Sequence, residues 1–444
     1  MSISANEALR RIKVTVEAQS PKTAGKRLYW WRRAVQAAMI LVFILIPLTG
    51  LFRIDPAAGS FVVLGRQVWF SDFSIVMGFW VAVASALILM YSTVGMAFCG
   101  WACPQNTLSE WANRMTHKFL GKRAEVSLDG EPLHVSPGKR KWTNWLILGA
   151  LFLGVSMAAA LIPLLYFYAP GAIWSFITFQ EDARLANSLH WIYTIFVVII
   201  LVDIAVVRYF FCRFMCIYRV WQHSFKTKQT LHIAYDAARA DAAGCATCNY
   251  CVKVCPVEID PRNTSLYDSC INCGACVTAC DSLQQKSNAA SLLRFEFGAR
   301  VAAARTGLRS GLISLFGRAG WTLPVTLAGA ALFAWGIWNY EPYHFSVYRA
   351  ETLQGATIQD YRINVANKLY QDVTLKIDVR GLPAGSYDLA SDQAAFTGAG
   401  RQDINLHIRP GLAPGLHSFT VDIAAADGWR KSYRVQHFVP RGKA

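Results

Sequence analysis

Twelve cysteines stand in four groups with short, regular intervals. Eight of them form two runs of the pattern Cys-x2-Cys-x2-Cys-x3-Cys, and Pro256 follows the first run. The runs are Cys245, Cys248, Cys251, Cys255 and Cys270, Cys273, Cys276, Cys280. Such spacing favours thiolate ligands of metal centres over a disulfide framework. The doubled run is typical of bacterial ferredoxins that hold two [4Fe–4S] clusters.

The fourth cysteine of each run in these ferredoxins binds the cluster of the other run. The pattern therefore predicts that one cluster binds Cys245, Cys248, Cys251 and Cys280, and the other Cys270, Cys273, Cys276 and Cys255. A pair of zinc knuckles is the alternative, and the doubled run with its proline disfavours it. Asp281 follows Cys280 where the first run has proline, which removes no ligand. Two adjacent clusters predict a one-electron relay.

The other four cysteines form two pairs, Cys99-Gly-Trp-Ala-Cys103-Pro104 and Cys212-Arg-Phe-Met-Cys216. A spacing of four predicts that both sulfurs of a pair project from one face of a helix. Four thiols at one site suit a soft ion such as Cu(I), with Met96 and Met215 as candidate thioether ligands. A dithiol redox centre and simple packing of small apolar side chains are the alternatives.

Hydrophobic residues make up 54% of the chain and charged residues only 16%, which argues against an ordinary soluble enzyme. Residues 34–52, 74–97, 145–167, 190–207 and 319–338 are each long and apolar enough to cross a bilayer, which takes about 20 helical residues. The first stretch lacks a small-residue cleavage site and is expected to be an uncleaved anchor. Asp203 is the one charged residue in these stretches, a candidate for a proton or ion path or for a structural hydrogen bond.

Positive charge predicts the orientation of the spans. Lys and Arg number two in residues 53–73 and one in 168–189, against seven in 98–144 and fourteen in 208–320. By the positive-inside rule the N-terminus and the two basic segments are cytoplasmic, the C-terminal region lies outside, and both cysteine pairs lie at the cytoplasmic edge of the membrane. The net charge of +16 follows from this topology, so no nucleic-acid partner is expected.

The C-terminal region alternates polar and apolar residues in short runs, for example Val373-Thr-Leu375-Lys-Ile377. A period of two predicts half-buried strands, and the Gly- and Pro-rich turns between them predict a small antiparallel, all-β sandwich of about a hundred residues. The expected organisation is a multidomain membrane protein. Its parts are a cytoplasmic segment at 1–33, a transmembrane bundle at 34–216, a cytoplasmic ferredoxin module at 217–318 with its core at 240–285, a fifth membrane helix at 319–338 and a periplasmic sandwich at 339–444.

Four sequence motifs resemble the FixG/CcoG/RdxA family of cytochrome c oxidase accessory proteins. They are Cys99-Gly-Trp-Ala-Cys103-Pro104-Gln105, Thr230-Leu-His-Ile-Ala-Tyr235-Asp236 with Arg239, the cysteine runs with Ile259-Asp260-Pro-Arg262, and Tyr361-Arg-Ile-Asn-Val-Ala-Asn367-Lys368. The resemblance covers roughly residues 30–440. It departs at Ile217-Tyr-Arg-Val-Trp-Gln222, where the family usually continues with Pro-Tyr-Ala-Arg-Phe-Gln.

The resemblance implies five membrane spans, a ferredoxin module and an immunoglobulin-like domain, and a cupric reductase that converts Cu(II) to Cu(I) for assembly of a cbb-type oxidase. Copper would be held by Cys99, Cys103, Cys212 and Cys216. The implied partners are oxidase subunits or copper-delivery proteins, together with a cytoplasmic electron donor. A quinol- or ferredoxin-linked electron-transfer subunit of a respiratory reductase and a redox-sensing assembly scaffold are the alternatives.

Overall fold

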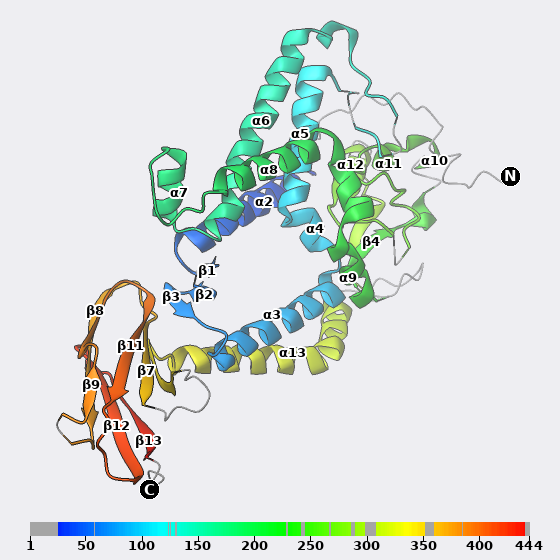
Figure 1. The fold of residues 1–444 in the computed structure, drawn as a ribbon. Coiled ribbons are helices and arrows are strands. Elements are labelled where there is room, and N and C mark those ends of the chain that lie inside the picture. The colour runs from blue at the N-terminus through cyan, green and yellow to red at the C-terminus, as the bar shows by residue number, and fades with distance from the viewer. Residues whose placement is uncertain are drawn as a thin grey trace, which may run out of the picture. The chain divides into compact units, whose positions relative to one another are not determined.

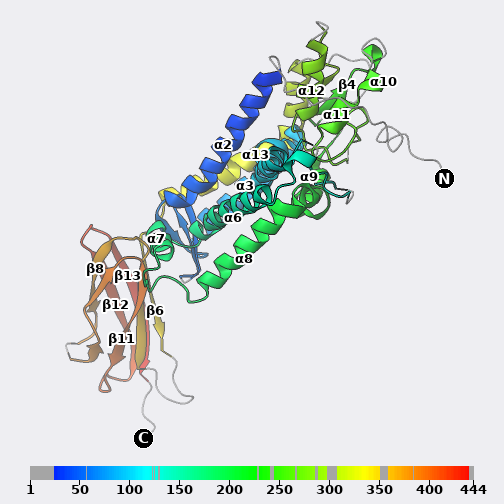
Figure 2. The same cartoon turned by 90° about the horizontal axis from the view of Figure 1, so that it is seen from above.

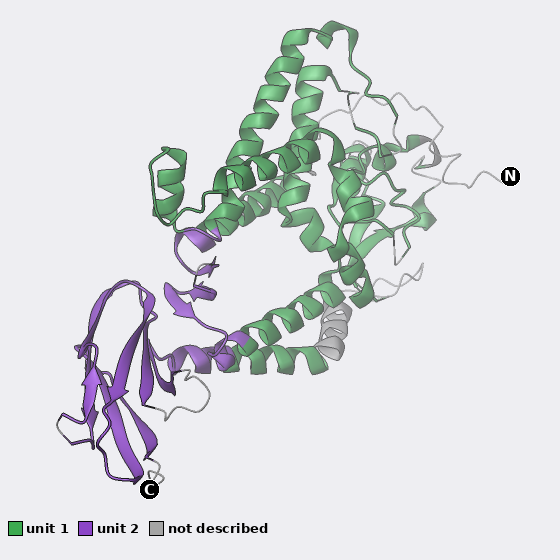
Figure 3. Cartoon of the chain, in the orientation of Figure 1, with its two compact units in different colours: residues 1–45, 77–165, 169–332 green, residues 46–76, 166–168, 333–444 purple. Residues whose placement is uncertain are grey.

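The computed structural model describes residues 25–439 apart from 57, 123, 125, 129–130, 228–229, 241–244, 266–267, 286–288, 298–307, 351–358 and 384. The chain divides into two compact units, coloured separately in Figure 3. Unit 1 consists of Met1–Leu45, Met77–Leu165 and Ala169–Leu332, and unit 2 of Ile46–Val76, Tyr166–Tyr168 and Phe333–Ala444.

In the part of the chain that the structure describes, five helices are long and apolar enough to cross a membrane, as predicted. They are α2 (Gly25–Leu48), α3 (Phe73–Val94), α6 (Trp142–Leu165), α8 (Leu189–Val202) with its π-helical continuation η2 (Asp203–Val207), and α13 (Leu308–Trp338) (Figure 1). Helices α2 and α13 begin well before their apolar stretches, because a helix continues through the polar residues that flank a span.

Helices α3 and α13 pack directly against each other within unit 1. Thr326 Oγ1 donates a hydrogen bond to Ser85 Oγ at 2.9 Å. A Cβ atom on Gly329 would lie 2.6 Å from the backbone nitrogen of Ala82. Small residues and interhelical hydroxyl contacts stabilise membrane helix pairs, since hydrocarbon offers no hydrophobic drive between apolar helices.

The fourth span passes into the second cysteine pair through irregular helix. Two π-helical segments, η2 and η3 (Phe211–Met215), flank Arg208, whose φ of 43° is rare for a residue with a side chain. Arg208 is buried, and its guanidinium donates to Ile204 O, Asn113 Oδ1 and Thr116 Oγ1. These bonds anchor the end of the span to helix α5 (Pro104–Leu120).

The ferredoxin module is built around one antiparallel strand pair, β4 (His232–Tyr235) and β5 (Leu293–Glu296). Three short helices lie between these strands in the sequence, namely α10 (Cys245–Cys248), α11 (Tyr250–Lys253) and α12 (Ala275–Gln284). Positive φ values at Asn249, Asn272 and Gly274 curl the two cysteine loops, at residue types that tolerate this conformation.

Unit 2 contains a two-sheet β-sandwich, whose strands are labelled in Figure 2. One sheet has the order β6-β7-β11-β9 and the other β10-β8-β12-β13. The strands are β6 (Tyr343–Arg349), β7 (Asp360–Asn367), β8 (Asp372–Arg380), β9 (Tyr387–Leu389), β10 (Gln393–Thr397), β11 (Gly400–Ile408), β12 (Gly415–Ala425) and β13 (Arg430–Val439). Inward residues of both sheets, such as Ile363, Leu375 and Phe419, form one core, as the alternating sequence predicts.

A small sheet from the first loop packs against this sandwich inside unit 2. It consists of β1 (Phe52–Asp55), β2 (Ser60–Val63) and β3 (Arg66–Val68), which the sequence analysis did not predict. The Gln67 amide donates to Lys368 O at 2.9 Å. The Lys368 ammonium, with a side chain 3% exposed, pairs with Asp72 at 2.8 Å. The loop is therefore fixed to the sandwich by a buried ion pair as well as by backbone hydrogen bonds.

Candidate metal centres

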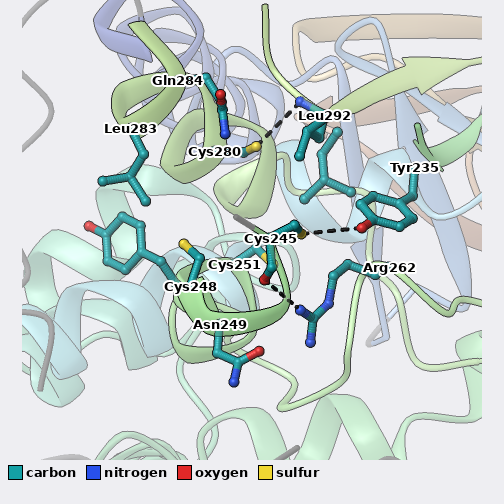
Figure 4. A pocket seen from close by; sticks show the side chains of 12 residues that line it. Tyr235, Cys245, Cys248, Asn249, Cys251, Arg262, Cys280, Leu283, Gln284 and Leu292 are labelled. Atoms are coloured by element: carbon teal, nitrogen blue, oxygen red, sulfur yellow. Dashed lines mark hydrogen bonds between the residues drawn. The ribbon is translucent and has the colours of Figure 1, made fainter. Parts of the chain in front are cut away.

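Four cysteines line one cavity of the ferredoxin module, which we call the first cysteine cavity. They are Cys245, Cys248, Cys251 and Cys280, in a space of about 400 Å³ (Figure 4). Tyr235 Oη donates to Cys245 Sγ at 3.2 Å, and the Leu292 amide donates to Cys280 Sγ at 3.3 Å. Four thiols around one space match the donor set of a [4Fe–4S] cluster.

The other four cysteines of the module line a second cysteine cavity of about 320 Å³, namely Cys255, Cys270, Cys273 and Cys276. The remaining lining residues are apolar or glycine: Ile233, Val257, Ile259, Pro261, Ile271, Gly274 and Ala275. Each cavity thus draws three cysteines from one run and the fourth from the other run. These two sets are the ones expected from the sequence.

The two remaining pairs lie at helix junctions, which corrects the expectation of a continuous helix. Cys99 is in α4 (Ala97–Trp101), and Cys103 caps the start of α5 with ψ of 125°. Cys212 is in η3, and Cys216 caps the start of α9 (Ile217–Phe225) with ψ of 109°. Pro104 explains the first break, because the residue before a proline is excluded from helical geometry. The second pair repeats this geometry although Ile217 replaces proline.

These four residues, the membrane-edge quartet, interact with one another. Burial raises the pKa of the Cys99 thiol to about 12, and the charge of Cys103 adds to this effect. Burial also raises the pKa of Cys212, and the charges of Cys103, Cys99 and Cys216 raise it further. The Cys99 and Cys212 thiols are therefore protonated at neutral pH in the metal-free protein, and binding a soft metal ion there would release protons.

Backbone and side-chain groups tie the two pairs together. Cys99 Sγ donates to Oε1 of Gln222, a buried residue of α9, at 3.1 Å. Backbone N–H groups of Gln105 and Asn106, in the first turn of α5, lower the pKa of Cys103, while burial, the larger effect, raises it. The first turn of α5 therefore points backbone N–H groups at Cys103, and such a helix N-terminus favours a metal-bound thiolate.

The membrane-edge quartet adjoins the second cysteine cavity. Cys99 and Cys212 pack on an apolar cluster that contains Tyr209, Ile271 and Cys273. Trp101 Nε1 donates to Asn272 O at 2.9 Å. A Cβ atom on Gly100 would lie 2.5 Å from Ile271 O and 2.8 Å from Cys273 Cα, so the cysteine loop approaches α4 as closely as glycine allows.

The two methionines predicted as thioether ligands of the quartet differ in their exposure. Met96 is buried beside α4, whereas Met215 is 59% exposed, so the two thioethers have unlike surroundings. Among the described residues, no three His, Cys, Asp or Glu side chains are close enough to hold a single metal ion. The cysteines that bind a [4Fe–4S] cluster are spaced around the cluster and need not lie close to one another. One copper ion bound by the quartet would require its four sulfur atoms to move closer together. Asp203 accepts a hydrogen bond from Gln105 Nε2 at 2.8 Å.

Comparisons with known proteins agree with this architecture. A family model described as a 4Fe-4S binding domain matches residues 76–123, and one described as a 4Fe-4S dicluster domain matches residues 238–297. The chain is 27% identical over 246 residues to "Protein RdxA" of Cereibacter sphaeroides, covering 52% of this chain and 50% of the relative. It is 28% identical over 252 residues to "Nitrogen fixation protein FixG" of Rhizobium meliloti, covering 52% and 46%. These relatives and the dicluster match bear out the resemblance to the FixG/RdxA family.

The chain spans about half the length of these curated relatives. Among solved structures, a FixG-related protein from Vibrio parahaemolyticus aligns with 22% of this chain and 97% of its own, at 15% identity and a TM-score of 0.19. The resemblance drawn from the sequence motifs is therefore supported. The chain is similar to ferredoxin-type iron–sulfur electron-transfer proteins and has, among its described residues, five helices long and apolar enough to cross a membrane.

Sequence reasoning missed two residues of this region. Tyr235 appeared only as part of a family motif, and nothing in its neighbours in sequence indicates that its hydroxyl reaches Cys245. Gly100 carried a weak signal, because a glycine between Cys99 and Trp101 permits a close backbone approach.

Proposed function

We propose that the protein is a membrane cupric reductase that supplies Cu(I) for assembly of a cbb-type cytochrome c oxidase. In this proposal the first cysteine cavity and the second cysteine cavity each hold a [4Fe–4S] cluster. The membrane-edge quartet of Cys99, Cys103, Cys212 and Cys216 binds the copper substrate. The reaction adds one electron to Cu(II) and gives Cu(I), and a cytoplasmic one-electron donor supplies that electron.

The observation that carries this proposal is the contact between the quartet and the second cysteine cavity. The loop that bears Cys273 touches the helix that bears Cys99 at Gly100, with no side chain between the two backbones. The sites therefore follow one another within unit 1 from the first cavity to the second cavity and then to the quartet. A bound [4Fe–4S] cluster supplies one-electron transfer, which is the stoichiometry that Cu(II) reduction requires.

The chain's own residues favour the reduced product. Thiolates prefer Cu(I) to Cu(II), so the four sulfurs draw the reduction forward. The helix N-termini at Cys103 and Cys216 stabilise the thiolates that copper needs. Burial of Cys99 and Cys103 keeps the thiols neutral until the metal arrives.

The proposal includes an orientation and an outer partner. The N-terminus, the quartet and the ferredoxin module lie on the cytoplasmic side of the inner membrane, and the sandwich is periplasmic. The strand order supports an immunoglobulin-like topology. In one sheet β6, β7 and β11 correspond to strands A, B and E of that fold, and in the other β8, β12 and β13 correspond to strands C, F and G. The sandwich would bind oxidase subunits or copper-delivery proteins.

The test is metal analysis with a cupric reductase assay on anaerobically purified protein. The variants are Cys99→Ser/Cys103→Ser and Cys212→Ser/Cys216→Ser, with Cys270→Ser as a comparison in the second cavity. Both double variants should lose copper binding and Cu(II) reduction while keeping wild-type iron. The comparison variant should lose iron. Copper reduction that is unchanged in the double variants would refute the cupric-reductase proposal in favour of quinol-linked electron transfer or a redox-sensing scaffold.

A second candidate role for the quartet has its own support. The match of residues 76–123 to a 4Fe-4S binding domain covers Cys99 and Cys103 and favours a further iron–sulfur cluster there. Iron content separates the two roles, because two [4Fe–4S] clusters contain about eight iron atoms and three about twelve. Under this second role the double cysteine variants would lose about a third of the iron.

A further inference from the structure

We propose that Tyr235 sets the reduction potential of the cluster in the first cysteine cavity, by donating a hydrogen bond from its hydroxyl to the ligand sulfur of Cys245. This inference rests on the proposed function, since it requires a cluster in that cavity. It assigns to Tyr235 a positioning role that acts through a ligand.

The fold holds the tyrosine in place. Tyr235 is the last residue of β4, and its register partner on β5 is Leu293, which also lines the cavity. Residues that far apart in sequence meet only because the two strands pair. The hydroxyl lies 3.2 Å from Cys245 Sγ, and Figure 4 marks this hydrogen bond with a dashed line.

The hydrogen bond favours the reduced cluster. Reduction adds one negative charge, which spreads over the ligand sulfurs, and a donor to a sulfur interacts more strongly with the more negative form. The hydroxyl therefore raises the reduction potential of this site. Its loss should make the site harder to reduce.

A neighbouring charged pair does not replace this effect. Arg262 donates to Cys245 O at 3.3 Å, but its guanidinium is also bound to Asp260 at 2.7 Å, with both side chains about nine-tenths buried. The Asp260 carboxylate offsets part of the positive charge, although the guanidinium also faces the Cys245 side chain. Because Arg262 is present in wild type and in Tyr235→Phe alike, the difference between these two proteins reports the tyrosine hydroxyl.

The second cysteine cavity differs in the source of its donors. Its lining residues other than cysteine carry no side-chain donor. Backbone N–H groups of Val257 and Ile259 face Cys255, and that of Asn272 faces Cys270. A side-chain substitution can therefore shift the potential of the first site alone.

The experiment is a redox titration followed by electron paramagnetic resonance on anaerobically purified full-length protein. It compares wild type, Tyr235→Phe and Tyr250→Phe. Tyr250 lines the same cavity and is the matched control. In Tyr235→Phe one of two centres should become harder to reduce by about tenfold, the size of one hydrogen bond, which is about 59 mV for one electron. The other centre and both centres of Tyr250→Phe should keep wild-type potentials.

A second measurement detects the hydrogen bond from Tyr235 to Cys245 directly. In deuterated buffer, pulsed resonance spectra of wild type should show an exchangeable deuteron coupled to one centre, and Tyr235→Phe should lack it. Unchanged potentials in an iron-replete Tyr235→Phe would overturn this inference alone. Loss of half the iron in that variant would also overturn it, because the hydroxyl would then hold the site together. A wild type without iron would overturn the proposed function as well.

Discussion

Replacing Gly100 with alanine tests whether the contact between the second cysteine cavity and the quartet matters. The added Cβ atom would lie 2.5 Å from Ile271 O and 2.8 Å from Cys273 Cα. Both are backbone atoms, which no rotamer change can move away. The substitution leaves every cysteine in place.

The size of the disturbance follows from these distances. Ordinary non-bonded contact lies at about 3.5 Å, so the Ile271 carbonyl and α4 must separate by about 1 Å. Overpacking of this kind costs about 1–3 kcal/mol of unfolding free energy, which leaves the protein folded. The loop that carries Cys273 is therefore the segment expected to move away from α4. The hydrogen bond from Trp101 to Asn272 O should lengthen or break.

The assay mixes chemically reduced protein with Cu(II) in a stopped-flow instrument and records Cu(I) formation. Gly100→Ala should retain wild-type iron and reduce Cu(II) more slowly. Gly149→Ala is the control, since nothing lies within 4 Å of a Cβ atom at that helical glycine of the same unit. If Gly100→Ala reduces Cu(II) as fast as wild type and Gly149→Ala, the close approach is not the route by which copper is reduced.

Two further predictions concern unit 2. Lys368→Met should destabilise it by about 3–5 kcal/mol, because Asp72 is left without its buried partner. Lys431→Met breaks an exposed ion pair and should cost about 0–1 kcal/mol of unfolding free energy. Hydrogen exchange of the β7 amides compares the stability of the two variants. Equal losses of stability would contradict the burial argument. Burial lowers the pKa of His437, so its contribution to stability is complete above about pH 6.5 and is lost as pH falls through the lower folded value. The protection factors of β13 amides, which correct for the intrinsic slowing of exchange at acid pH, should therefore fall on acidification in wild type and fall less in His437→Gln. The same pH profile of protection in both would count against this prediction.

The family, the five apolar helices and the cysteine sets could be predicted because each depends on nearby residues. Whether a segment enters a bilayer is decided by its own summed transfer free energy. The short spacings of each cysteine run place three thiols of one loop around a single cavity, which is the arrangement that a [4Fe–4S] cluster needs. Likewise, the period of two in residues 373–379 fixes which face of β8 is buried.

The form of the two cysteine pairs depended on more than spacing. A separation of four predicted one helical face, yet Cys103 and Cys216 cap new helices. Pro104 was a visible signal for the first break. The second break follows the irregular helix around Arg208, whose guanidinium is held by residues of α5 about ninety positions earlier in the chain.

Sequence alone predicted which cysteines group together and which segments are apolar enough to cross a membrane, because both are local properties of composition and spacing. Tertiary structure alone decided that Tyr235 reaches Cys245, that Gly100 meets Ile271 and Cys273, and that the loop around Asp72 is fixed to Lys368. Such contacts join segments that are distant in the chain. They depend on the shapes of all the packed elements between them, which no short stretch of sequence specifies.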